Sequence, residues 1–420
     1  MELISLIFAI NLLMLQCGAI NITFEPSDEV EVYMGHTREV PYVVLNITEG
    51  ECVLYTDDPH ISELKHQVTI KDVGQTGNVT LKGNFIGYTF LSCKNPITQE
   101  RNLQVELQIK CLRKQRIVDR IFTGSTAALV ALIYVNFGCA VQWGELRNLL
   151  KKPVGPLLGF CGQFVMMPLI CYGMGFVLFP NNPTMRLGMF FTGVSPGGGA
   201  SNIWTAILEG NIDLSILMTT VSTLAAFGMM PLWLFTLGAT IFSDANIEVP
   251  YSHISTYVVA LIVPLGIGYL IQRYLEKTGL FLKRILKGFS SLLILFIIIF
   301  AIVTNLYLFE LFSWEIVVAG MVIPWMGYMV GYIVAKILRQ PNTDAIAIAV
   351  EIGIQNTGIS IFLLRFALDS IEADLTTVIP VSVAIMTPFP LGVLFICKKI
   401  KQRFWPTSPA EKIDDKETTP

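Results

Sequence analysis

Long apolar stretches recur along this chain from residue 121 onward, separated by short polar segments. Each stretch is long enough to cross about 30 Å of hydrocarbon as a helix that rises about 1.5 Å per residue. We therefore predict an all-α polytopic membrane domain over 117–400, followed by a polar, disordered tail over 401–420. The expected spans, about nine in number, lie near 121–143, 153–178, 186–208, 213–241, 252–273, 288–309, 314–336, 343–368 and 374–397.

The segment before the membrane domain has a different pattern, in which apolar and polar positions alternate. A period of two is typical of a half-buried strand, and shorter runs of this kind are bounded by Gly, Asn and Pro. We therefore predict a small extracellular β-sandwich over 20–116. The clearest strand has Leu103, Val105, Leu107 and Ile109 on one face. The same segment holds every N-x-[ST] glycosylation acceptor of the chain, namely Asn21, Asn46 and Asn78.

Residues 1–19 have the pattern of a secretory signal peptide, an apolar core followed by the small residues 17–19. The core is short for a membrane span, which favours cleavage after residue 19. The lack of Lys or Arg before the core leaves a retained signal anchor as the alternative. The exported domain would fold in an oxidising compartment, where Cys52 and Cys93 can form a disulfide between the two sheets. Otherwise the two cysteines stay reduced or pair elsewhere.

Basic residues orient the predicted spans. Export places the N-terminus outside, and nine spans then place the C-terminus in the cytoplasm. The inside loops and the tail would hold most of the basic residues, as the positive-inside rule requires, and the outside loops little more than Arg186 and Arg365. The cluster from Lys110 to Arg120 disagrees, but it follows a segment already committed to export. An exported glycoprotein without a retention signal is expected in the plasma membrane.

Composition supports the membrane class and excludes two others. Hydrophobic residues make up 53% of the chain and charged residues 15%, whereas a soluble domain carries about 25% charged residues. The basic residues lack interleaved stacking aromatics, so we expect no nucleic-acid partner. The chain also lacks a Ser/His/Asp grouping, a phosphate-binding loop or paired carboxylates, so we do not expect an enzyme.

Polar groups inside the predicted spans are concentrated in three places. Segments 195–202 and 351–358 each interrupt an apolar stretch, the first with Pro and a Gly triplet, and hydroxyl residues follow from Ser215 to Thr223. Unwound backbone is tolerated at membrane depth only where it is buried in protein or lines a wet cavity. Two interrupted helices, one in each half, indicate a secondary transporter with inverted repeats.

The side chains in these places are those of a hard-cation site. Amide oxygens, hydroxyls and freed carbonyls surround one carboxylate, Glu351, and no His or Cys is nearby to favour zinc or copper. An ionised carboxylate at this depth costs at least about 2.5–3.5 kcal/mol. No Lys or Arg lies in the middle of a span to pair with it. The partner is therefore a bound cation or a proton.

Residues from about 120 to 397 resemble the bile acid:sodium symporter family (solute carrier family 10). The exported domain has a looser similarity to that of the P3 and P5 members. The matching motifs are, in order, Phe137-Gly138-Cys139, Lys152-Pro153, Gln163-Phe164 with Met167-Pro168, 196–215, 218–223, Met230-Pro231-Leu232 and Glu351-x-Gly353-x-Gln355-Asn356.

The resemblance implies a moving core, in which both broken helices cross, and a smaller panel formed by the first, fifth and sixth spans. The substrate would bind near Gly197, Gly198, Gly199 and Asn356. Asn211, where vertebrate members commonly have Asp, and Gly199, in place of Thr, are departures from the family pattern. The first sodium site would comprise Ser201, Asn202, Ser215, Thr219 and Glu351, and the second Gln163, Glu351, Gln355 and the carbonyls of Ile352 and Ile354.

The functional hypothesis is a sodium-coupled symporter that moves an amphipathic organic anion, a bile acid or steroid conjugate, by alternating access. Sodium ions would be the coupling ions, and no organic cofactor is expected. One alternative is a non-transporting receptor or partner-binding membrane glycoprotein that acts through the N-terminal domain. The other is a proton-coupled carrier in which Glu351 titrates.

Overall fold

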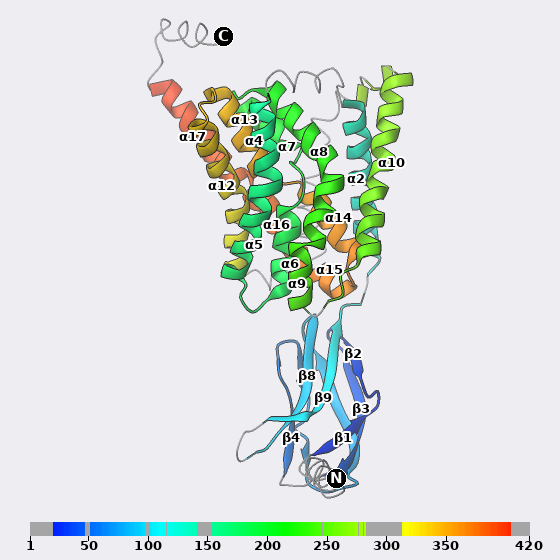
Figure 1. Cartoon of the computed structure of the whole chain (residues 1–420). Helices are drawn as coiled ribbons and strands as arrows, with labels where there is room; N and C mark the ends of the chain where they lie inside the picture. Colours follow the sequence, from blue (N-terminus) through cyan, green and yellow to red (C-terminus); the bar gives the residue numbers. More distant parts are fainter. Residues whose placement is uncertain are drawn as a thin grey trace, which may run out of the picture. The chain divides into compact units, whose positions relative to one another are not determined.

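The computed structural model describes residues 20–46, 51–96, 101–114, 116–140, 153–245, 247–275, 277–279, 281–282 and 313–404. The predicted signal peptide, the predicted span 288–309 and residues 405–420 of the predicted tail lie outside these ranges. The chain divides into two compact units, Met1–Arg116 and Ile117–Pro420 (Figure 1).

The first unit consists of two β-sheets that share one apolar core. Its four-stranded sheet has the order β1-β3-β7-β5 and its five-stranded sheet the order β2-β9-β8-β4-β6. The strands are β1 (Asn21–Phe24), β2 (Glu29–Tyr33), β3 (Thr37–Asn46), β4 (Cys52–Thr56), β5 (Ser62–Leu64), β6 (Thr69–Ile70), β7 (Thr76–Gly83), β8 (Gly87–Lys94) and β9 (Arg101–Leu112).

The alternating pattern forms a strand with one buried face, as predicted. In β9, Val105, Leu107 and Ile109 are buried in the core, while Glu106 between them is exposed. Strand geometry turns successive side chains to opposite faces, so the apolar positions of both sheets meet in the middle. The N-terminal unit is therefore a β domain with its own hydrophobic core.

A disulfide joins Cys52 and Cys93, so the predicted pairing is confirmed. Its placement differs from the prediction, because the bond does not connect the two sheets. Cys52 lies in β4 and Cys93 in β8, which are antiparallel neighbours in the five-stranded sheet, with Leu54 opposite Cys93. The two Cα atoms are 5.9 Å apart, a spacing close to that of facing residues on adjacent strands. The bond therefore ties two neighbouring strands of one sheet.

The second unit is helical. Its elements are α2 (Ile117–Ala140), α4 (Val154–Cys161), the π-helix η1 (Gly162–Met166), α5 (Met167–Leu178), α6 (Pro183–Gly193), α7 (Ala200–Ile207), α8 (Ile212–Phe235), α9 (Leu237–Asp244), α10 (Tyr251–Tyr274), α12 (Trp314–Ile337), α13 (Asn342–Gly353), α14 (Thr357–Ala367), α15 (Ser370–Thr376), α16 (Val378–Met386) and α17 (Pro388–Phe404).

Among the described residues of this unit, six helical stretches are long and apolar enough to cross a membrane. They overlap six of the predicted spans and show a polytopic helical membrane protein. The predicted spans 186–208 and 343–368 are each split into two shorter helices, α6 with α7 and α13 with α14. Both splits fall at the Gly-rich or polar interruptions seen in the sequence, where helix propensity is lowest.

Two glycines allow two helices of the unit to touch. α2 and α10 run side by side (Figure 1) and meet at Gly138 and Gly268. A Cβ at Gly268 would collide with the carbonyl oxygen of Val135, and one at Gly138 with that of Leu265. The two backbones can therefore touch only because both positions lack a side chain.

Candidate ion-binding site

The two broken helices cross each other at their interruptions. Gly197 forms an isolated antiparallel bridge with Gln355. The Gly198 amide donates to the Ile354 carbonyl at 2.7 Å, and the Asn356 amide donates to the Pro196 carbonyl at 2.9 Å. Backbone groups without helical partners thus form hydrogen bonds with one another. Buried backbone N–H and C=O groups need such partners because water cannot reach them.

Small residues make this crossing sterically possible. A Cβ at Gly198 would lie 2.9 Å from the Gln355 carbonyl oxygen, and one at Gly197 would collide with a carboxylate oxygen of Glu351. On the other side, the Asn356 side chain caps α14 by accepting from the Ile359 amide at 3.2 Å. The second interruption is shorter than predicted, since Glu351 still belongs to α13 and only 354–356 are non-helical.

Glu351 is the centre of a polar cluster formed by three helices. Its side chain projects from α13 and is only 1% exposed. One carboxylate oxygen, Oε2, accepts from the Ser201 hydroxyl of α7 at 2.7 Å and from the Thr219 hydroxyl of α8 at 2.9 Å. Ser215, one turn before Thr219, accepts from the Thr205 hydroxyl at 3.3 Å. The structure thus places Ser201, Thr219 and Glu351 of the predicted first set in direct contact, with Ser215 one turn before Thr219 on α8.

The second predicted set also assembles. The Gln163 amide nitrogen donates to the Gln355 side-chain oxygen at 2.5 Å and to the Ser195 carbonyl at 2.6 Å. Gln355 in turn donates to the Ile352 carbonyl at 2.8 Å. The Ile354 carbonyl is occupied differently, because it accepts the Gly198 amide in the crossing. A carbonyl has two lone pairs, so both backbone oxygens keep one for a cation.

A π-helix turns Gln163 toward this cluster. Pro168 has no N–H, so the carbonyl of Phe164 loses its regular helical donor, and the Trp233 indole donates to that carbonyl at 2.7 Å instead. Gln163 lies inside η1 and is fully buried. Single π-turns of this kind occur often at functional sites because they redirect one side chain.

Three buried oxygens of the predicted ligands have no hydrogen-bond donor within the described part of the chain: Glu351 Oε1, Gln163 Oε1 and Asn202 Oδ1. Leaving a polar atom buried without a partner costs about 1–3 kcal/mol, more for a charged group. Oxygens of this type, together with carbonyls of broken helices, are the ligands that bind coupling ions in transporters. These oxygen ligands therefore fit a hard monovalent cation.

Two residues of the cluster were missed by the sequence analysis as site residues. Thr205 is fully buried against Ser215, and the Ser195 hydroxyl lies 3.4 Å from the side-chain oxygen of Gln355. Thr205 follows Ser201 by four residues, so it shares a helix face with a predicted ligand, and this spacing could have revealed it. Ser195 begins the polar segment 195–202 noted in the sequence, but a residue in a non-helical segment has no helix face that would indicate its neighbours.

The residues expected to bind the substrate lie at the crossing itself. Gly197 and Gly198 are buried, while Gly199 and Asn356 are partly exposed. The amides of Gly198 and Asn356 already donate to backbone carbonyls. An anionic head group would therefore find fewer free amides here than the sequence suggested.

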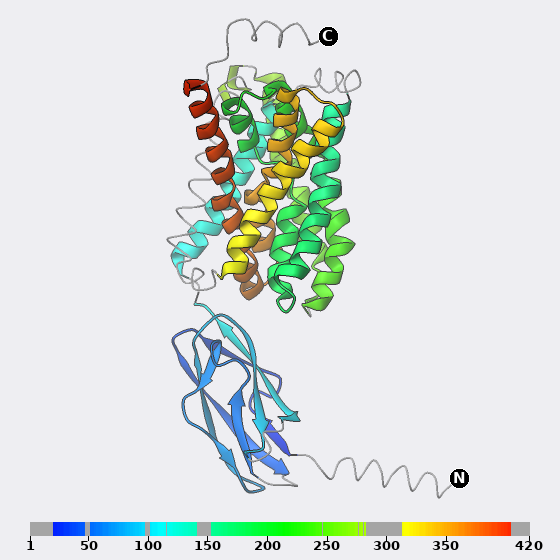
Figure 2. The same cartoon turned by 90° about the vertical axis from the view of Figure 1, so that its left-hand side faces the viewer.

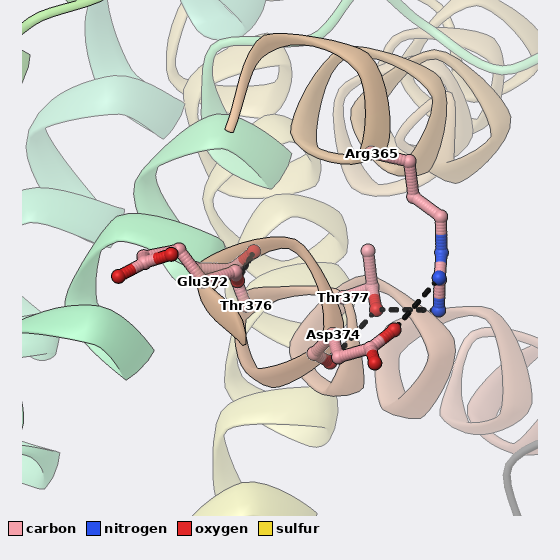
Figure 3. Close-up of polar contacts among 5 residues, drawn as sticks. All are labelled: Arg365, Glu372, Asp374, Thr376 and Thr377. Atoms are coloured by element: carbon pink, nitrogen blue, oxygen red, sulfur yellow. Dashed lines mark hydrogen bonds and ion pairs between the residues drawn. The ribbon is translucent and has the colours of Figure 1, made fainter. Parts of the chain in front are cut away.

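A second polar cluster lies where α14 leads into α15 and α16 (Figure 3). The Arg365 guanidinium donates to Asp374 at 2.8 Å and to the Thr377 hydroxyl at 3.4 Å, and both members of the ion pair are almost fully buried. Glu372 points away from this pair. Arg365 therefore does not lie in a loop as the sequence suggested, because its partner Asp374 holds it inside the last turn of α14.

The three predicted glycosylation acceptors lie on one sheet of the β domain. Asn21 is in β1, Asn46 ends β3 and Asn78 is in β7, and all three side chains are exposed. These strands belong to the four-stranded sheet. Exposure is what a glycan attachment site requires, and the modification itself stays a prediction.

Comparison with known proteins decides the family. The model of the sodium bile acid symporter family matches residues 127–310. The ileal sodium/bile acid cotransporter of Cricetulus griseus is 33% identical over 270 residues, which are 63% of this chain and 75% of the cotransporter. This chain belongs to the sodium bile acid symporter family. This cotransporter and the sodium-dependent organic anion transporters are named as transporters, not as enzymes.

Two further relatives show the range of the family. The P3 protein of Homo sapiens is 33% identical over 260 residues, which cover 61% of this chain and 54% of the P3 protein. The sodium-dependent organic anion transporter of Bos taurus is 31% identical over 258 residues, or 60% of this chain and 66% of that transporter. The chain thus spans about half the length of the P3 proteins it matches.

Proposed function

We propose that this member of the sodium bile acid symporter family is a sodium-coupled symporter of an amphipathic organic anion. The observation that carries the proposal is the environment of Glu351, a buried carboxylate with hydroxyl donors on one oxygen and no donor on the other among the described residues. In that part of the chain Glu351 also has no ion-pair partner. A bound cation would neutralise it and fill the free position.

Two sodium sites would share this carboxylate. One would use Ser201, Asn202, Ser215 and Thr219 beside Glu351, and the other Gln163 and Gln355 with the carbonyls of Ile352 and Ile354. Both sites involve residues from each broken helix or its neighbour, so sodium would brace the crossing. Ions that bind one access state more tightly shift the equilibrium between the access states toward that state. This difference in ion affinity couples the ion gradient to substrate transport.

The substrate class comes from two relatives. Their names refer to bile acid and to organic anions. We place the anion between core and panel near the crossing, reached by alternating movement of the core. In this arrangement the chain crosses the plasma membrane about nine times, with an extracellular N-terminus and a cytoplasmic C-terminus, as the distribution of basic residues supports.

Uptake into cells or proteoliposomes tests the proposal. We expect a bile acid or a steroid sulfate to accumulate in sodium and not when choline replaces sodium. Glu351→Gln should abolish sodium-dependent uptake while Glu315→Gln, at the start of α12, should not. Surface expression of both variants is the control for folding.

The other outcomes separate the alternatives. Uptake driven by a pH gradient without sodium would replace the sodium proposal with proton coupling through Glu351. A folded protein that transports none of the anions and is not stabilised by sodium would contradict symport and favour a receptor. Wild-type transport by Glu351→Gln would remove the central role of this carboxylate.

A further inference from the structure

The last two turns of α17 carry three cations that no part of the ion-binding site uses. Lys399, Lys401 and Arg403 are all exposed. We call these three residues the basic end of α17. Figure 2 shows α17 along one edge of the helical unit.

An exposed apolar stripe runs between these cations. Ile396, Ile400 and Phe404 are four residues apart, so they share one helix face, and each is about half exposed or more. At 3.6 residues per turn, Lys399 and Lys401 lie roughly 100° to either side of this stripe. The helix therefore presents apolar side chains flanked by positive charge on both sides, the arrangement of a helix surface at a membrane interface.

The stripe continues the lipid-facing surface of a membrane span. α17 ends the apolar stretch Ser370–Phe404, which is long enough to cross a membrane. Val393 and Leu394, one turn earlier on α17, are also exposed. A side chain exposed on a spanning helix faces lipid, so the same face reaches the headgroup region as it extends past the apolar stretch.

Lys398 fixes the direction in which the basic end faces. Its ammonium donates to Glu209 at 2.7 Å and to the Leu208 carbonyl at 2.9 Å, at the end of α7. This contact lowers the pKa of the Glu209 carboxyl. Lys398 lies on the side of α17 opposite the apolar stripe, so holding it against the protein turns the stripe outward. Lys399, at the edge of the stripe, lies 5.7 Å over the Phe395 ring and remains exposed.

We propose that the basic end of α17 is a binding site for the headgroups of anionic phospholipids. Clusters of Lys and Arg directly after a membrane span attract anionic lipids, and the long side chains place their charges at the headgroup level while their methylene stems stay on apolar surface. The acyl chains of the bound lipid would lie along the apolar stripe. Phosphatidylserine has both the charge and the chains that this surface fits.

Titration of the purified full-length protein with phosphatidylserine, followed by native mass spectrometry, tests the site without substrate or sodium. We expect phosphatidylserine to bind more tightly than phosphatidylcholine with the same chains. Each cation near a membrane surface contributes a factor of about five in affinity. Lys401→Gln should therefore weaken phosphatidylserine binding about fivefold, and the triple variant K399Q/K401Q/R403Q about a hundredfold.

Two controls locate the effect. Lys336→Gln removes an exposed lysine at the end of a different span, α12, and should leave the affinity unchanged. The charge-preserving triple variant K399R/K401R/R403K should bind like the natural protein. Equal affinity for the two lipids, an unaffected K399Q/K401Q/R403Q variant, or an equal loss in Lys336→Gln would overturn the proposal.

Discussion

At the scale of single residues, the candidate site depends on what is missing at Gly197 as much as on what Glu351 contributes. The hydroxyls of Ser201 and Thr219 fix one carboxylate oxygen, and the absent side chain at Gly197 leaves the other oxygen room. A Cβ at Gly197 would lie against this oxygen and would fill part of the space beside it. The glycine is therefore as specific a part of the site as the carboxylate.

Gly197→Ala should weaken sodium binding by about 1–3 kcal/mol, which is roughly 5–150-fold in affinity, because its Cβ would collide with Glu351 Oε1. The measurement is the shift of the thermal unfolding midpoint with sodium concentration, since a ligand that binds the folded state stabilises it. Gly173→Ala in α5 is the matched control, because a Cβ there meets nothing within 4 Å. The same sodium response in both variants would show that Gly197 is only a packing position.

Cys111 provides a test of the β domain at the same scale. It is a free, fully buried thiol in β9, and burial raises its pKa to about 11. The neutral thiol is favoured in the folded domain, so its contribution to stability is complete below the unfolded-state pKa of about 8.5 and is lost as the pH rises through about 11.

We therefore expect Cys111 to resist maleimide in the folded protein at about pH 8 and to react once the protein is denatured. Peptide mass spectrometry after labelling measures the modification of Cys111 in both samples. Equal labelling of Cys111 in the folded and the denatured protein would contradict its burial.

At the scale of elements, the crossing of α2 and α10 is a contact sensitive to side-chain volume. Gly268→Ala should lower the thermal unfolding midpoint, because its Cβ would meet the backbone of α2 and cost about 1–3 kcal/mol of overpacking. Gly266→Ala, two residues away on the same helix, has open space around its Cβ and should keep or raise the midpoint. A similar effect of both substitutions would mean that the helices do not touch at Gly268.

The sequence predicted these elements unevenly, and for physical reasons. Hydropathy located the six apolar helices, because membrane thickness fixes both their length and their composition. It located the two interruptions but not their ends, since Glu351 stays helical while 354–356 do not. The ends of the interruptions depend on which distant backbone carbonyl accepts each freed amide, as the Ile354 carbonyl accepts the Gly198 amide. A local sequence pattern does not encode these long-range partners.

The disulfide shows the same limit within the β domain. We predicted that Cys52 and Cys93 pair because the exported domain would fold in an oxidising compartment, and the structure contains this disulfide. Strand order decides whether such a bond spans two sheets or one, and strand order follows from contacts between residues far apart in the chain. Oxygen-bearing residue types predicted the candidate ion site, which stays a prediction, whereas Thr205 was not singled out because a buried threonine is usually a packing residue.

At the scale of the whole molecule, the family match and the β domain concern different units. The family model covers residues 127–310, all within the helical unit. The proposed transport function therefore concerns the helical unit, and the β domain has its own core and disulfide to keep it folded. A role of the β domain in recognition and a role of the helices in transport are compatible within one chain.

The placement of the three acceptor asparagines affects how the β domain can be targeted. They all belong to the four-stranded sheet, so glycans attached to them would shield that sheet from large molecules. The five-stranded sheet carries no acceptor in its described strands and exposes polypeptide, including Tyr33 and Phe90. An antibody against the native glycoprotein would therefore find its epitope on that sheet, whatever the composition of the sugar chains.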